Sequence, residues 1–363
     1  MGESPAEIMP KTHGATIQPN PIEAETLDVE LSIRRSTTES VVSTTPVLES
    51  INKEATDFYE PKVDAEAIHD ALEASPVDTK TIVQVLAGRT GAQRLKIVEE
   101  YKILYKSKLA EDLNQKLEGW FKELMVAVVT PLIDYYVKEL YEAMYGRGTD
   151  EDTLIDIICT SSSQQIREIV AVFKDTYKEP LESYIQIDTS GYFKELLLAL
   201  ISANRDQSET VNSEQAAADA KTLYQAGEGM FGTDESTFIT ILTQRNYKQL
   251  KQIFDEYQKL TGHSLEDAIQ IEFSGFVKRG LLAIIKTVLN LPSYFADRLH
   301  ASMSGTGTYN KHLIRIVATR SDIDLFLVRI YYNLNYEVTL EEDIIDDTSG
   351  DYRTGLLRLV EGN

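Results

Sequence analysis

The distribution of apolar residues divides the chain into two parts. From about Val63 onward, apolar residues recur at intervals of three and four, as at Ile68 and Leu72 and again at Ile82 and Val85. This spacing places them on one face of an α-helix. Glycine and proline lie mainly between such stretches, and sustained alternation with a period of two is rare. The pattern predicts an all-α protein with almost no β-sheet.

Residues 1–60 show neither periodicity. Their apolar residues are scattered, prolines interrupt them and acidic residues outnumber basic ones. Such a segment buries too little apolar surface to offset the entropy of ordering it. We therefore expect 1–60 to be a mostly disordered tail. Its basic and Ser/Thr-rich stretch at 34–40 suits phosphorylation, although disordered sequence also produces such strings by chance.

The helical part contains an internal repeat. Four segments align with one another: 81–101, 153–173, 237–257 and 312–332. The longest step between them carries a polar stretch at 204–219, which we interpret as a linker. We expect repeats at 61–130, 131–203, 220–289 and 290–363, each of about 70 residues and about five short helices. One such unit is marginally stable alone, so the four should share a core.

Composition and charge exclude several classes of partner and location. The chain has 363 residues, 36 Lys+Arg, 58 Asp+Glu and a formal net charge of −22. This charge argues against sequence-independent binding of nucleic acid and against simple electrostatic adhesion to anionic lipid. The single cysteine, Cys159, allows no intramolecular disulfide, which favours a reducing, cytoplasmic location. Neither a secretory signal nor an apolar run long enough to span a bilayer is visible.

Three repeats share a glycine-rich turn, and in each an acidic residue follows at a fixed distance. The turns lie at 144–149, 227–233 and 303–308, their last glycines are Gly148, Gly232 and Gly307, and the acids are Asp188, Glu272 and Asp347. Each acid lies 40 positions after its glycine and precedes a Ser-Gly pair by two residues. A single turn of this kind is usually a helix-to-helix corner, in which Thr149 or Thr233 would cap the next helix. Three copies with one spacing favour a composite binding site.

The donor atoms of such a site point to calcium. Glycine-rich turns expose carbonyl oxygens, and one carboxylate adds one or two more oxygens, without histidine or cysteine. An irregular, oxygen-only site suits Ca²⁺, which takes six to eight oxygen ligands. Water or a phosphate must supply the remainder. Lipid phosphate would raise Ca²⁺ affinity, and Ca²⁺ would raise lipid affinity by the same factor. Divalent ions would thus allow an acidic chain to meet an acidic membrane.

From about Val63 to its end, the sequence resembles the annexins. The resemblance rests on the three Gly-x-Gly-Thr-like turns with an acid 40 residues on, on AMYGRGTDEDTL at 143–154, on NRD at 204–206 and on DTSGDY at 347–352. It implies a curved all-α disc whose convex face carries Ca²⁺ and binds acidic phospholipid reversibly. The ligands that it implies are the carbonyls of Met144, Gly146 and Gly148 with Asp188, those of Gly227, Met230 and Gly232 with Glu272, and those of Met303, Gly305 and Gly307 with Asp347.

The first repeat departs from this pattern. Its turn, at 72–77, contains no glycine, and Lys116 occupies the position of the acid. An ammonium group adds positive charge where an oxygen donor is needed, so we expect this site to be lost. Glu118, two residues further on, leaves a partial site as the alternative. In the fourth repeat, Tyr309 and Asn310 replace the acids that begin the next helix elsewhere, which should weaken that helix start.

Side chains at the turn tips are expected to contact the bilayer. We place Arg147, Met230, Phe231 and Thr306 there. Met230 and Phe231 suit insertion at the membrane interface, with packing against a neighbouring helix as the alternative. Arg147 suits a lipid phosphate, with a solvated side chain as the alternative.

Three functions follow from these patterns. The first is calcium-dependent binding to acidic phospholipid, with membrane organisation or aggregation as its outcome. The second is a scaffold that acts through the tail or through self-association. The third, an enzyme, finds no support, because no nucleophile–base or acid–base arrangement is visible. We expect Cys159 and Trp120 to be buried. The resemblance implies that the tail at 1–60 is a regulatory segment that offers a site for a protein partner. It leaves ion conduction and export without a signal peptide open.

Overall fold

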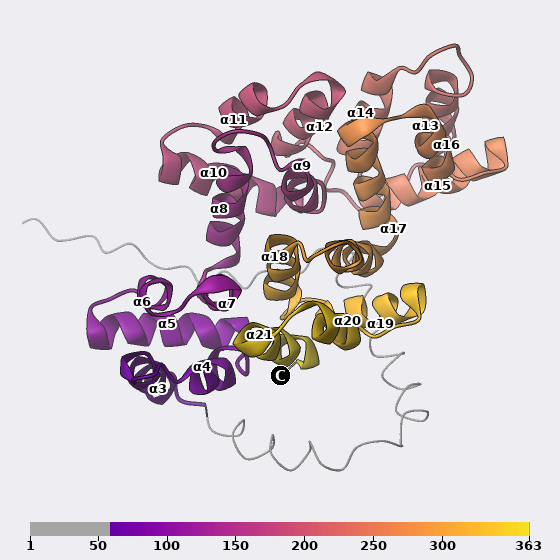
Figure 1. Cartoon of the computed structure of the whole chain (residues 1–363). Coiled ribbons are helices and arrows are strands. Elements are labelled where there is room, and N and C mark those ends of the chain that lie inside the picture. Colours follow the sequence, from indigo (N-terminus) through magenta and orange to yellow (C-terminus); the bar gives the residue numbers. More distant parts are fainter. Residues whose placement is uncertain (1–58, 363) are drawn as a thin grey trace, which may run out of the picture. The chain divides into compact units, whose positions relative to one another are not determined.

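The computed structural model describes residues 59–362, and these residues form helices and connecting turns with no strand (Figure 1). This confirms the all-α fold class predicted from the apolar periodicity. The tail predicted at 1–60 lies outside the described residues, apart from its last two.

Helices follow one another with short connections in every repeat. In the first repeat they are α3 (Pro61–Glu73), α4 (Thr79–Leu86), α5 (Gly91–Tyr105), α6 (Leu109–Lys116) and α7 (Gly119–Val129). In the second they are α8 (Leu132–Met144), α9 (Glu151–Leu154) with the π-helical segment η1 (Ile155–Cys159), α10 (Ser163–Tyr177), α11 (Leu181–Asp188) and α12 (Gly191–Ile201).

The third and fourth repeats share one long helical element. The third contains α13 (Ser213–Ala226), α14 (Glu235–Gln244), α15 (Tyr247–Thr261), α16 (Leu265–Glu272) and the start of α17 (Gly275–Met303). The fourth contains the end of α17, then α18 (Asn310–Arg320), α19 (Leu325–Tyr336), α20 (Leu340–Asp347) and α21 (Gly350–Glu361). Asn290 has non-helical angles (φ −163°, ψ 89°), and Pro292 follows it. The chain therefore bends inside α17, because proline removes a helical hydrogen bond.

The polar stretch at 204–219 is only partly irregular. Residues 204–212 have no regular structure, but α13 already begins at Ser213, so the second half of the predicted linker is helical. Asn212 caps this helix by accepting a hydrogen bond from the backbone N–H of Gln215. The irregular part is held in place, since Asn246 donates a hydrogen bond to Asp206 at 2.9 Å.

The equivalent helix of each repeat ends with the same backbone conformation, although the residue at that position differs. Helices α5, α10, α15 and α19 all end at a left-handed residue, with φ between 55° and 87°: Lys106, Lys178, Gly262 and Glu337. Only Gly262 adopts this conformation without steric cost. The helix end is therefore imposed by the packing of the repeat and not by a local glycine signal.

The described residues share one continuous apolar core. Helix α7 of the first repeat packs on α18 and α21 of the fourth, and α12 of the second packs on α14 and α17. The repeats thereby cover faces that a 70-residue unit would expose alone, as expected for a repeat array.

A buried charge network joins the second repeat to the fourth. Arg315 donates to Asp156 at 2.8 Å, Arg298 donates to the same carboxylate at 2.8 Å, and the Tyr294 hydroxyl donates to it at 2.6 Å. Burial alone would raise the pKa of Asp156, but Arg298 and Arg315 hold this pKa below its ordinary value. The network thus keeps a buried carboxylate ionised between two repeats.

Candidate metal centres

The three glycine-rich turns are closed by the same backbone hydrogen bond. The N–H of Asp150 donates to the carbonyl of Ala143 at 2.8 Å, and that of Tyr309 donates to Ser302 at 2.8 Å. In the third repeat, whose turn is one residue longer, Asp234 donates to Ala226 at 2.7 Å. Each bond joins the end of one helix to the start of the next, so the turn between them projects as a fixed loop.

The last glycine of each turn has a positive φ. Gly148, Gly232 and Gly307 have φ values of 92°, 88° and 93°. A Cβ added at any of them would meet no atom within 4 Å, so the backbone conformation and not space requires glycine. The backbone of the three turns therefore has the same conformation at this glycine, one residue before the threonine that contacts the acid.

The acid of each repeat lies beside its turn. The hydroxyl of Thr149 donates to the carbonyl oxygen of Asp188 at 3.1 Å. Thr233 donates to Oε2 of Glu272 at 3.1 Å. In the fourth repeat, Thr308 donates to both the carbonyl oxygen and Oδ2 of Asp347, at 3.1 and 3.0 Å. The constant spacing in the sequence therefore corresponds to contact in space.

These threonines do not cap the next helix, contrary to the helix-corner interpretation. The N-caps are Asp150 and Asp234, whose side chains accept the backbone N–H groups of Thr153 and Thr237. Thr149 and Thr233 precede the N-cap, and their hydroxyls are therefore free to bind the acid. Tyr309 provides no side-chain cap to α18, so this helix start lacks the hydrogen bond that Asp150 and Asp234 accept in the other two repeats.

The donors available at each turn fit a hard cation. Among residues 59–362, no group of three or more His, Cys, Asp or Glu side chains is placed to hold a metal. An ion at these turns would therefore depend on backbone carbonyls together with one partly buried carboxylate. Such a set suits Ca²⁺ completed by outside oxygens. One expected ligand is already engaged, because the carbonyl of Gly227 accepts the N–H of Met230 at 3.0 Å and keeps one lone pair.

The first repeat keeps the turn closure but not the donors. Asp78 donates its N–H to Ala71 at 3.0 Å, as in the other repeats. Lys116, at the position of the acid, lies with its Nζ 2.9 Å from Oε1 of Glu73, which belongs to the turn. An internal ion pair thus stands where the other repeats carry a carboxylate beside their turn. Glu118 precedes α7 and lines a cavity shared with the fourth repeat.

The expected membrane-contact residues are exposed. The side chain of Phe231 is fully exposed, so it does not pack against a neighbouring helix, and Met230 is 49% exposed. Arg147 and Thr306 are exposed as well.

Sequence reasoning missed two further apolar residues at the same end of the repeats. Ile187 and Ile271 immediately precede the acids of the second and third repeats and are 81% and 74% exposed. The available signal was an isoleucine at the same position in two aligned repeats.

Two other sequence expectations have opposite outcomes. Trp120 was expected in the core but is 43% exposed, because it lies at the start of α7 and lines the cavity between the first and fourth repeats. Cys159 is buried as expected, and burial raises the pKa of its thiol well above the ordinary value. In residues 59–362, no helix is both long and apolar enough to cross a membrane.

Comparison with known proteins identifies the family. The annexin family model matches at 63–128, 135–200, 218–284 and 294–359. Annexin A7 of Homo sapiens is 42% identical over 297 residues, which cover 82% of this chain but only 61% of annexin A7. Among solved structures, annexin III superposes with a TM-score of 0.81 at 42% identity, covering 85% of this chain and 95% of that one.

A calcium-bound annexin, (Sm)1, also superposes, with a TM-score of 0.76 at 30% identity, covering 83% of this chain and 90% of that one. Four matching repeats and extensive identity together establish that this chain belongs to the annexin family.

Proposed function

We propose that this protein binds acidic phospholipid membranes through Ca²⁺ ions held at the turn–acid pairs of the second, third and fourth repeats. Its family is known for calcium-dependent phospholipid binding. The observation that carries the proposal is the recurring contact between a turn threonine and the acid 39 residues later, at Thr149, Thr233 and Thr308.

Each proposed site divides the ion's coordination between protein and membrane. Carbonyls of the turn and the nearby carboxylate supply part of the shell, and a lipid phosphate or water supplies the rest. The ligands are those implied by the family resemblance: Met144, Gly146, Gly148 and Asp188, then Gly227, Met230, Gly232 and Glu272, then Met303, Gly305, Gly307 and Asp347. The first repeat takes no ion, because Lys116 and Glu73 neutralise each other there.

Membrane binding depends on the concentration of Ca²⁺. A chain with a net charge of −22 is repelled by an anionic surface, so the apo protein stays away from it. Bound divalent ions reverse the charge locally and accept phosphate oxygens. Once docked, the exposed apolar side chains Phe231 and Met230 enter the interface. The protein is accordingly peripheral to membranes when Ca²⁺ rises, and acts there in membrane organisation.

Co-sedimentation with phosphatidylserine vesicles tests this proposal. We expect binding with Ca²⁺ and none with chelator. The triple variant Asp188→Asn, Glu272→Gln and Asp347→Asn should abolish it. A charge-matched control changes three exposed acids that form ion pairs away from the turns, Glu111→Gln, Asp175→Asn and Glu209→Gln, and should bind normally. Retained binding by the first triple variant would show that the ligands are misassigned, and equal binding in chelator would refute the calcium requirement.

A further inference from the structure

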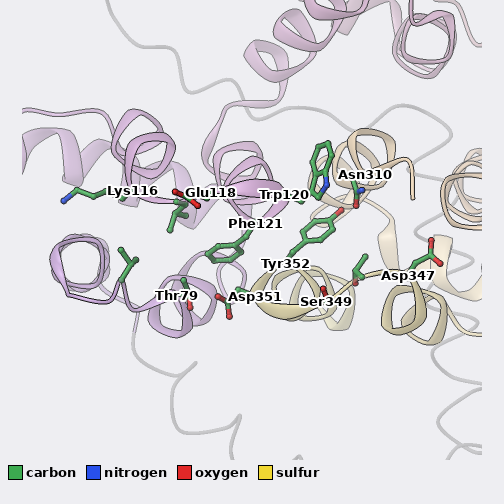
Figure 2. Close-up of a pocket in the computed structure, with 13 residues that line it drawn as sticks. Thr79, Lys116, Glu118, Trp120, Phe121, Asn310, Asp347, Ser349, Asp351 and Tyr352 are labelled. Atoms are coloured by element: carbon green, nitrogen blue, oxygen red, sulfur yellow. The ribbon is translucent and has the colours of Figure 1, made fainter. Parts of the chain in front are cut away.

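A cavity of about 480 Å³ opens between the first and fourth repeats, beside the acid of the fourth (Figure 2). Its walls come from equivalent parts of the two repeats. Trp120 and Phe121 of α7 line one side, and Asp351 and Tyr352 of α21 line the other. Asp347, the proposed ligand of the fourth repeat, also lines it. The cavity therefore adjoins a proposed calcium site.

The other pair of repeats fills the corresponding place with aromatic rings. Phe193 of α12 and Phe276 of α17 align with the cavity residues, and their ring centroids lie 5.7 Å apart. In the first and fourth repeats, the position of Phe276 is taken by Trp120 and by Asp351. The fourth repeat therefore has an acidic residue where the third has an aromatic ring.

The charges of the cavity favour a cation. Three acidic residues line it, Glu118, Asp347 and Asp351, against one basic residue, Lys116. The Lys116 ammonium is already paired with Glu73 at 2.9 Å. An anion would be repelled by the three carboxylates, whereas a cation would be attracted.

The aromatic walls suit an organic cation in particular. Trp120 is 43% exposed, whereas Phe121 and Tyr352 are 8% and 7% exposed. The indole ring is therefore accessible to a ligand, and the other two rings are largely buried. Faces of aromatic rings attract ammonium groups, and tryptophan attracts them most strongly. A hydrated metal ion would gain little from these rings.

The hydroxyl of Tyr352 selects among organic cations. It is buried, and it finds no hydrogen-bond partner among residues 59–362. In Figure 2 it points toward Trp120 and Asn310. Burial raises the pKa of Tyr352 above its ordinary value, so the group stays a neutral hydroxyl at physiological pH. A buried hydroxyl without a partner is costly, and a ligand N–H would supply one. A primary ammonium has such N–H groups, whereas a quaternary ammonium has none.

We propose that this cavity binds a primary ammonium group, that of the ethanolamine headgroup of a phospholipid. Assignment to a lipid rests on the proposed function, because the phosphate of the same headgroup would then reach the calcium ion at Asp347. Two carbons separate the ammonium from the phosphate ester oxygen in ethanolamine phospholipids, which suits two adjacent sites. The carboxyl group of a serine headgroup would meet Glu118 and Asp351 and be repelled.

Trp120 provides a direct readout, because it is the only tryptophan of the chain. The full-length protein, kept in chelator, is titrated with ethanolamine and with choline at constant ionic strength while its fluorescence is followed. We expect a saturable change with tighter binding of ethanolamine. Glu118→Gln and Asp351→Asn should each weaken it several-fold, and Asp175→Asn, far along the chain in α10, should not.

Tyr352→Phe removes the hydroxyl and keeps the aromatic ring, so it tests the contribution of the hydroxyl to binding. Since the hydroxyl has no hydrogen-bond partner among residues 59–362, the variant should fold with an unchanged or raised melting temperature. We expect it to reduce the preference for ethanolamine over choline by about tenfold or more, the value of one hydrogen bond to a charged group. A preference that survives this change, or a linear fluorescence change shared by all variants, would overturn the proposal.

Vesicles then identify the source of the ammonium. With Ca²⁺, replacing phosphatidylcholine by phosphatidylethanolamine at constant phosphatidylserine should strengthen binding several-fold in the wild type and not in Tyr352→Phe. Equal binding to both mixtures, with calcium dependence intact, would overturn the headgroup assignment and leave the proposed function standing. Loss of calcium-dependent binding to every mixture, with the ethanolamine titration intact, would refute the proposed function instead.

Discussion

The Nζ atom of Lys116 lies 2.9 Å from Oε1 of Glu73, so the lysine that replaces the acid in the first repeat pairs with a residue of its own turn. The turn of this repeat still closes with the same backbone hydrogen bond, from Asp78 to Ala71. We therefore predict that this repeat has lost its ion site through its donor groups, although the closure of its turn is kept. The retained frame allows a direct test of what a site needs.

Restoring the acid alone should not restore an ion site. Lys116→Asp replaces the ammonium by a carboxylate, but the turn at 72–77 has no glycine with a positive φ to direct its carbonyls. The new carboxylate would also face Glu73. We expect the number of bound Ca²⁺ ions, measured by calorimetry, to equal that of the wild type. One additional ion would show that the acid suffices, or that Glu118 completes a partial site.

The two glycines of the fourth-repeat turn differ in whether the backbone conformation requires glycine. Gly307 has a φ of 93°, whereas Gly305 has no positive φ and an added Cβ would approach only the carbonyl of Gly307, at 3.9 Å. Gly307→Ala should cost about 1–2 kcal/mol in that conformation and weaken Ca²⁺ binding at this repeat. Gly305→Ala should be nearly neutral for unfolding. Calcium titration and chemical denaturation in chelator measure both, and equal effects would remove the role assigned to φ.

Exposed isoleucines beside the acids should strengthen membrane attachment. Ile187→Ser together with Ile271→Ser removes two side chains that are 81% and 74% exposed next to the proposed ions. We expect vesicle binding to weaken about tenfold or more, since burying each side chain in lipid contributes at least 1 kcal/mol. Melting temperature should not change, because neither side chain packs in the core. Val63→Ser, at the first turn of α3, is the exposed apolar control. Unchanged vesicle affinity in the double variant would place these residues away from the bilayer.

The buried network between the second and fourth repeats should dominate stability. Arg315→Met leaves Asp156 and Glu139 buried with less compensation, and such a loss typically costs 3–5 kcal/mol. Urea denaturation should show this decrease in the free energy of unfolding. Lys108→Met breaks only an exposed ion pair with Glu111 and serves as the control with little effect. A small effect of Arg315→Met would mean that Arg298 alone keeps Asp156 ionised.

Local patterns in the sequence determined the fold class and the repeat. A period near 3.6 and glycines between apolar stretches encode helices and corners directly, and they predicted an all-α array. The constant interval from Gly148 to Asp188 and its counterparts pointed to a composite site because insertions were absent between the two. These features lie in the order and spacing of residues along the chain, so a single sequence suffices to find them.

Only the tertiary structure decided which residues meet and which are buried. It showed that Thr149 binds the acid and that Asp150 caps the helix, and it exposed Trp120 at a cavity between the first and fourth repeats. Arg315 and Asp156 lie 159 residues apart, so no local pattern could pair them. Burial and contact depend on how distant helices pack against one another, and that packing is a property of the whole chain.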